Sequence, residues 1–253
     1  MAKPIAVDTV LERLTALGER DLSQPWSFRD KPMDVRYALY RTIEDAQEIL
    51  VRLAARSHPE SRRILSLAGR AFGDLRGLLI GRPAELLDMA PREGEWSLRE
   101  TLRHIIVIEG RYAVQTRYAV ERADSDPMRA ADDTLPTPAQ TDVAGGIDVI
   151  LARVRAARAE TDRRLGDLPA AAMTRQTQWI QYDVDVRFRL HRFAAHVIEH
   201  TVQCEKTLAA LGSRMTEGRR IVRRLTALLG EIEGHGGHAE ARELEQRLVE
   251  RAG

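Results

Sequence analysis

The segment His196-Val-Ile-Glu-His200-Thr-Val-Gln203 decides how the rest of the chain is interpreted. In a helix, at about 100° per residue, His200 lies about 40° from His196 and Gln203 about 20° to the other side. Two imidazoles one turn apart on a rigid helix can bind the same metal ion. In isolation, histidines at this spacing more often pack in a core or lie at the surface. Because two ligands do not hold a catalytic metal, the interpretation depends on a third.

Helical periodicity extends from this segment in both directions, and strand signals are nearly absent. The expected helices cover about 6–20, 34–56, 60–80, 97–122, 147–165, 184–211 and 216–232, with a short one ending at Leu248. The segments 23–33, 124–145 and 167–183 are expected to be irregular. The sequence therefore predicts an all-α fold.

A third imidazole lies in the helix that Trp96-Ser-Leu-Arg-Glu100 opens. Ser97 and Glu100 form a capping-box pattern, and Trp96 can pack back on the first turn as a hydrophobic staple. His104 follows two turns later, on the flank of the apolar face. As an ordinary core histidine it needs only one hydrogen-bond partner. Together with the other two histidines it completes a three-imidazole set that leaves coordination positions for water or substrate.

Composition narrows the class of protein. The 253 residues carry a net charge of +1, from 39 basic and 38 acidic residues, and lysine occurs only at Lys3, Lys31 and Lys206. Because acids are interleaved with the arginines, no nucleic-acid partner is expected. No apolar run approaches the roughly 20 residues of a membrane span, and no secretory signal is expected at the N-terminus. One cysteine, Cys204, provides no disulfide framework, so a cytoplasmic location is expected.

The two histidine-bearing segments together resemble a known family. Trp96-Ser-x-x-Glu-x-Leu-x-His104, with the later His196-x-x-x-His200-x-x-Gln203, is similar to the DinB-like metal-binding four-helix bundles. The resemblance covers about residues 61–212 and implies an up-down-down-up bundle with a long second connection, which the 124–145 segment fits. Residues 1–60 and 213–253 would then be N- and C-terminal helical extensions. Many relatives carry Arg-Gly where this chain has Thr201-Val202, so the surroundings of the site differ from the family pattern.

The resemblance also implies a function, because the superfamily includes mycothiol- and bacillithiol-dependent enzymes. It implies a divalent transition metal on His104, His196 and His200, with Gln203 binding a cofactor. A three-imidazole site suits zinc, nickel, iron or copper, of which zinc and nickel are expected first. The implied activity is transfer of a low-molecular-weight thiol to or from an electrophilic small molecule, with no further catalytic residue assigned. A metal-dependent hydrolase and a non-enzymatic helical module with a structural metal are the alternatives, and a homodimer is left open.

Other residues rank lower as candidates. His191 lies about 140° from His196 around the helix and is expected to pack or face solvent. His235 and His238 lie in a glycine-rich loop and are weak metal candidates. Glu109 is interpreted as a solvated rim residue rather than a partner of the ligands. Cys204 is interpreted as a small buried hydrophobe rather than an edge of the site. The cluster Arg219-Arg-Ile-Val-Arg-Arg224 is interpreted as a solvated helix face, with a partner surface as the second reading.

One pair of segments shows internal similarity. Val35-Arg-Tyr-Ala-Leu-Tyr-Arg41 resembles Val186-Arg-Phe-Arg-Leu-His-Arg192. In this alignment Asp45 matches His196 and Ile49 matches His200, so an N-terminal copy would not keep the histidine pair. The similarity is consistent either with a degenerate repeat or with chance similarity between amphipathic helices.

Overall fold

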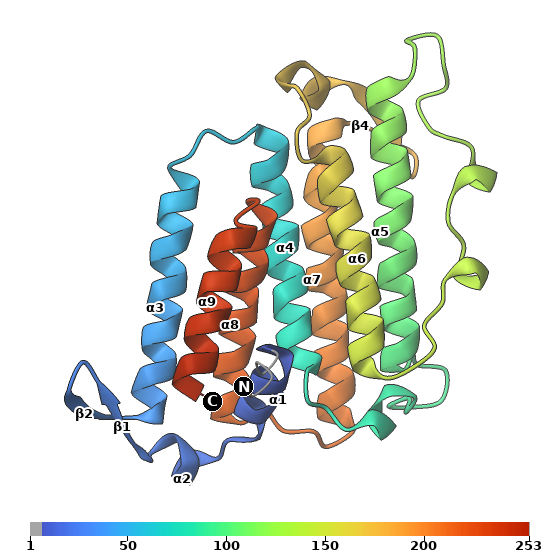
Figure 1. Ribbon diagram of the computed structural model, residues 1–253. Coiled ribbons are helices and arrows are strands. Elements are labelled where there is room, and N and C mark those ends of the chain that lie inside the picture. Colours follow the sequence, from blue (N-terminus) through green and yellow to red (C-terminus); the bar gives the residue numbers. More distant parts are fainter. Residues whose placement is uncertain (1–6, 253) are drawn as a thin grey trace.

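Helices make up nearly all of the regular structure in the computed structural model, which describes residues 7–252 (Figure 1). The exceptions among these residues are two short β-hairpins. The predicted all-α fold class is confirmed. Residues 1–6, with Lys3 and the expected helix start at Ala6, lie outside the described residues.

Four helices form what we call the central bundle: α4 (Glu60–Leu79), α5 (Leu98–Glu121), α6 (Ile147–Leu165) and α7 (Val186–Ala210). In Figure 1, α4 and α7 run downward and α5 and α6 run upward, and the long connection after α5 returns along the outside. Short 3-10 helices interrupt the connections at Ala84–Leu87, Asp132–Thr134, Pro138–Gln140 and Ala170–Thr174. The two histidine-bearing helices, α5 and α7, are therefore antiparallel.

The helices of the central bundle begin where side chains can satisfy their first amides. At the start of α5 the Ser97 hydroxyl accepts from the amide of Glu100 at 3.3 Å, and the Ser97 amide donates to the Glu100 carboxylate at 2.8 Å. The predicted capping box is thus confirmed. At the start of α7 the Asp185 carboxylate accepts from the amide of Phe188 at 2.8 Å. These two caps determine the register of the helices that present the three histidines.

Two segments that were expected to be irregular contain antiparallel hairpins, so that prediction was wrong there. Strands β1 (Pro25–Phe28) and β2 (Lys31–Asp34) precede α3, and β3 (Gln176–Trp179) and β4 (Tyr182–Asp185) precede α7. Their turns use left-handed residues other than glycine, with φ of 50° at Arg29, 62° at Asp30 and 57° at Ile180. Because each strand has only four residues and neither turn has the usual glycine, the pattern carried no strand signal.

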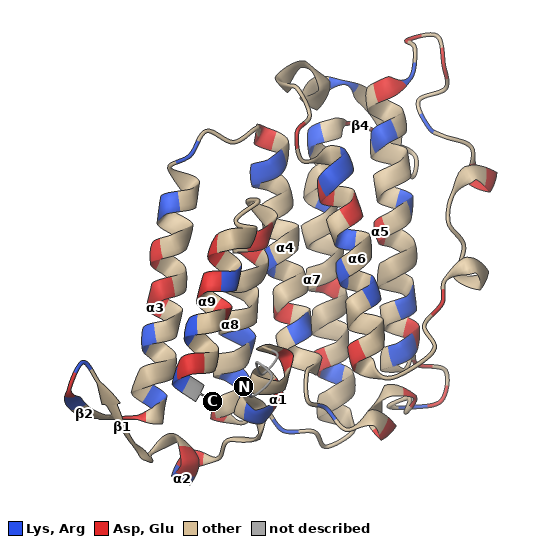
Figure 2. Ribbon diagram, viewed as in Figure 1, with Lys and Arg blue, Asp and Glu red and all other residues tan. Residues whose placement is uncertain are grey.

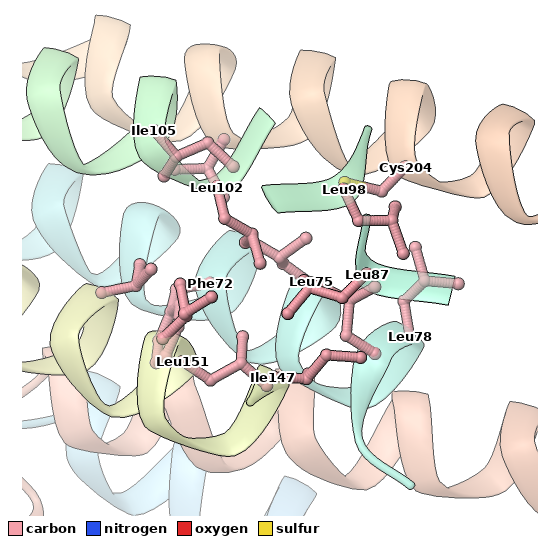
Figure 3. Packing of buried hydrophobic residues seen from close by; sticks show 14 of the residues in the cluster. Phe72, Leu75, Leu78, Leu87, Leu98, Leu102, Ile105, Ile147, Leu151 and Cys204 are labelled. Carbon is pink, nitrogen blue, oxygen red and sulfur yellow. The ribbon is translucent and has the colours of Figure 1, made fainter. Parts of the chain in front are cut away.

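Apolar side chains from all four helices fill the central bundle. Figure 3 shows Phe72 and Leu75 of α4, Leu102 of α5 and Leu151 of α6 meeting in one cluster. Cys204 of α7 joins the same cluster, with its sulfur close to the side chain of Leu98 in that view. This core includes Ile105 and Val197, the sequence neighbours of His104 and His196, and so packs α5 and α7 together beside the histidines.

The helices on either side of the central bundle in sequence pack together into what we call the flanking unit. It comprises α1 (Val7–Ala16), α2 (Glu19–Leu22), α3 (Val35–Ala54), α8 (Glu217–Gly234) and α9 (His238–Ala252). Leu11, Leu39, Val222 and Leu248, from four of these helices, share one buried cluster. The described parts of the N- and C-terminal extensions thus form a common core beside the central bundle (Figure 1).

Helices α4 and α8 join the two units at very short range. A Cβ added at Gly73 would lie 2.8 Å from the carbonyl carbon of Thr226, and closer still to its oxygen. A Cβ added at Gly230 would lie 2.9 Å from the carbonyl carbon of Gly69. Side chains at these positions would push the backbones apart, so the glycines allow the two helices to touch.

The internal similarity noted in the sequence corresponds to a shared local structure. In both copies a hairpin leads directly into a helix, α3 or α7. Asp34 caps α3 through the amide of Tyr37, as Asp185 caps α7. The amide of Val35 donates to the carbonyl of Gln24, and Val186 has the equivalent bond to Arg175.

The ion pairs that follow the two caps also correspond. Arg36 of α3 binds Glu217 at the start of α8 at 2.8 Å, and Arg187 of α7 binds Glu60 at the start of α4 at 2.5 Å. Helices α3 and α8 in one unit are therefore arranged like α7 and α4 in the other. This correspondence favours a degenerate repeat over chance similarity.

Basic and acidic side chains are mixed along the helices of both units (Figure 2). None of the helices within residues 7–252 is both long enough and apolar enough to cross a membrane.

Candidate metal centre

The structure brings together the three histidines that the sequence singled out. His104 comes from α5, and His196 and His200 come from successive turns of α7. The Nε2 atoms of His104 and His196 lie 3.2 Å apart, and one nitrogen of each ring falls within 4.8 Å of the others. The predicted convergence of the three imidazoles is therefore observed.

The geometry of the cluster fits a divalent transition metal. With bonds of about 2.0–2.1 Å to imidazole, two ligands of a tetrahedral ion stand about 3.3 Å apart. The 3.2 Å separation between His104 and His196 is close to this value. The Nδ1 atom of His200 lies 2.8 Å from Oε1 of Gln203, so Nδ1 carries the proton and Nε2 keeps its lone pair.

The surroundings of the rings favour their neutral form. Burial first, and then the neighbouring His200 and His104, lower the pKa of His196 to about 3. Burial also lowers the pKa of His104, followed by the effect of His200. Neutral imidazole is the form that binds metals, so both rings can serve as ligands at neutral pH.

Trp96 forms the outer wall of the cluster, a role that the sequence analysis did not assign to it. Its ring centroid lies 5.1 Å from that of His104 and 6.5 Å from that of His200. With 41 % of its surface exposed, Trp96 lies between these rings and solvent. The only sequence signal for this position was that Trp96 precedes the cap of the helix that carries His104.

A pocket of about 750 Å³ opens beside the cluster. The loop before α5 forms one side, from Pro91 to Trp96, and α7 forms the other, from Glu199 to Ala210. His200 and Gln203 both line it. A small molecule bound in this pocket can therefore reach the cluster from the His200 side.

The remaining histidines and the cysteine lie elsewhere. His191 is exposed, as predicted. The ring of His235 packs at a tilt against that of His58, with centroids 5.4 Å apart, and His238 is the first residue of α9 rather than part of a loop and lines a different pocket. Cys204 is completely buried, and burial raises the pKa of its thiol to about 12, which confirms the prediction of a small buried hydrophobe.

Glu109 was predicted to be a solvated rim residue, and this prediction was wrong. Glu109 is only 4 % exposed and forms an ion pair with Arg158 at 2.6 Å. The guanidinium of Arg158 also lies over the Phe193 ring. A carboxylate within a buried helix face needs such a partner, because an unpaired buried charge is strongly destabilising. The partner comes from α6, which local periodicity could not reveal.

The arginine cluster at 219–224 was interpreted as a solvated face, and the structure corrects this for two of its members. Arg223 pairs with Asp74 at 2.7 Å and with Glu205 at 2.9 Å. Arg219 donates to the backbone carbonyls of Ile80 and Gly81. These contacts tie α8 to α4 and α7.

The flanking unit has an ion pair where the central bundle has imidazoles. Asp45, which matches His196, lies 2.7 Å from Arg251 and 3.6 Å from Arg247 of α9. Ile49, which matches His200, is buried. Among residues 7–252 the histidine cluster is therefore confined to the central bundle.

A comparison with known protein families matches the part of the chain that carries the three histidines. A family model described as the DinB superfamily matches residues 69–204, which include all three histidines and Gln203. No curated protein matches the chain.

Proposed function

Since the chain belongs to the DinB superfamily, we propose that it is a metal-dependent enzyme that transfers a low-molecular-weight thiol to or from an electrophilic small molecule. The observation that carries this proposal is the convergence of three imidazoles beside a pocket of about 750 Å³. Structural zinc sites usually close the coordination sphere with four protein ligands, whereas catalytic sites use three and leave a position open. Three ligands next to a pocket fit the second pattern.

The residues of the site have distinct roles in this proposal. A divalent ion on His104, His196 and His200 would favour the thiolate form of a bound thiol at neutral pH. Gln203 holds the Nδ1 proton of His200 and so keeps its Nε2 directed to the cluster. Trp96 limits access of water to the rings. Cys204 is excluded as the nucleophile because its thiol is buried and its pKa is raised to about 12.

A second candidate function is metal-dependent hydrolysis with the same three ligands. The observation that favours it is Glu199, an exposed carboxylate that lines the pocket immediately before His200. A carboxylate in that place can accept a proton from an attacking water. The thiol reaction needs no such base, so the Glu199→Gln variant separates the two: it should abolish hydrolysis and retain thiol transfer at a saturating concentration of thiol.

Metal analysis tests the proposal first. Protein purified without a nickel column should contain one divalent ion per chain. His200→Ala should lose the ion, because two imidazoles seldom retain a divalent metal, and His191→Ala, on the same helix, should keep it. Circular dichroism of both variants must accompany the assay, since metal binding can be coupled to folding. If His191→Ala emptied the site and His200→Ala kept it, with both variants helical, the assignment of the ligands would be wrong.

Ligand exchange then distinguishes an enzyme from a module with a structural metal. In the Co²⁺-loaded protein, a thiol that binds the ion should produce a thiolate-to-cobalt absorption band. A closed structural site would not change its spectrum, and that result would contradict the proposed function.

A further inference from the structure

The pocket beside the histidines has a floor of polar side chains at helical spacing. Glu199, Gln203 and Lys206 follow one another on α7 at i, i+4 and i+7, which places them on one stripe of the helix. Arg92 and Glu95 line the pocket from the loop before α5. The start of α5 and the C-terminal half of α7 lie at the same end of the central bundle (Figure 1).

The charged side chains around this pocket form no ion pairs with other described residues. Lys206, Arg92, Glu95 and Glu199 are all exposed, and none forms an ion pair with another residue between 7 and 252. The nearby Arg99, by contrast, binds Asp88 at 2.6 Å. Two cations and two anions in one pocket, none of them neutralised by a neighbour, remain available to a ligand.

The basic residue at position 206 is a lysine rather than an arginine. The chain uses arginine for nearly all of its basic residues, and Lys206 is one of three lysines. A lysine ammonium is a compact charge on a flexible stem, which suits it to follow a carboxylate in an open pocket. Lys31, on the β2 strand that precedes α3, is the other lysine within the described residues.

We propose that the pocket binds a thiol that carries both a carboxylate and an ammonium group. The carboxylate lies against Lys206 and Arg92, the ammonium lies against Glu199, and the sulfur points to His200. Charges of both signs in the wall are complementary to a ligand with charges of both signs. This inference rests on the proposed function and specifies its thiol.

Three thiols that carry different charges test the inference in the Co²⁺-loaded protein. γ-Glutamylcysteine carries an ammonium group and carboxylates, N-acetylcysteine carries one carboxylate, and N-acetylcysteine amide carries no charge. In each of them the cysteine nitrogen is an amide, so none can chelate cobalt through the sulfur and the cysteine amine together. The thiolate-to-cobalt band gives the affinity of each, and the affinity should fall in the order given. An exposed charge contact contributes up to about fivefold in affinity, which sets the largest expected difference between successive thiols.

Single substitutions show which residue causes each difference in affinity between the thiols. Lys206→Met should remove about threefold of the advantage of N-acetylcysteine over its amide, and Glu199→Gln should remove the advantage of γ-glutamylcysteine over N-acetylcysteine. Lys31→Met is the matched control and should change neither ratio. Cobalt content and circular dichroism are measured for every variant, so that ratios are compared only between folded, loaded proteins.

The outcomes separate the inference from the proposed function. If all three thiols bind with equal affinity, or if Lys206→Met leaves the ratios unchanged, the inference is overturned and the thiol-dependent function stands. If no thiol changes the cobalt spectrum, the proposed function itself fails, and the inference with it.

Discussion

Replacing Gln203 with leucine should weaken metal binding about tenfold while leaving the fold intact. The Gln203 Oε1 atom accepts from Nδ1 of His200 at 2.8 Å, and leucine has no acceptor. One neutral hydrogen bond contributes about 0.5–1.5 kcal/mol, which is about twofold to thirteenfold in affinity. Loss of the outer partner of a metal-bound histidine typically costs about 10- to 100-fold. The two ranges overlap near tenfold, and a water that replaces the amide at the half-buried Gln203 keeps the effect at this lower end.

The measurement is a competition titration of zinc or cobalt against a chromophoric chelator. Gln203→Glu supplies a charged acceptor at the same place and should bind metal at least as tightly as the wild type. Gln47→Leu makes the same substitution at an exposed site in the flanking unit and should change nothing. Wild-type affinity in Gln203→Leu, with circular dichroism unchanged, would refute the argument that this hydrogen bond positions the His200 ring.

Three further predictions concern stability. Gly73→Ala should destabilise the protein, because the added Cβ meets the backbone of Thr226; overpacking of this kind costs about 1–3 kcal/mol and outweighs the roughly 1 kcal/mol gained in helix propensity. Gly18→Ala is the control, because a Cβ added there would lie 3.6 Å from its nearest neighbour, and this variant should melt within about 2 °C of wild type. Equal melting temperatures for Gly73→Ala and Gly18→Ala would contradict the close crossing of α4 and α8. Ser97→Ala should cost about 1 kcal/mol in thermal or urea denaturation, and an unchanged midpoint would show that the cap contributes nothing. The pKa of His196 in the folded protein is about 3, below the ordinary histidine value of 6.5, so the unfolded chain binds more protons. The stability of the metal-free protein should therefore be fully present above about pH 6.5 and fall as the pH drops toward 3. His196→Gln should flatten this dependence in urea denaturation followed across that range.

Much of the helical framework could be predicted from the sequence, because it depends on residues close together in the chain. The spacing of His196, His200 and Gln203 places them on one stripe of any helix, whatever surrounds it. The capping box of Ser97 and Glu100 uses atoms three residues apart. The hairpins before α3 and α7 are equally local, yet they were missed because their turns lack glycine and their strands are short.

The sequence by itself therefore determined the all-α class, the positions of most helices and the three histidines that converge. Only the tertiary structure decided what lies around them: Trp96 over the imidazoles, the buried pairing of Glu109 with Arg158, and the four charges without partners at the pocket. It also decided that helices from before and after the central bundle in sequence share one core. The physical reason is the range of the interactions. Helix periodicity and capping depend on neighbours within a few residues, whereas burial, ion pairing and the shape of a pocket depend on which distant segments pack together, and local spacing does not encode that.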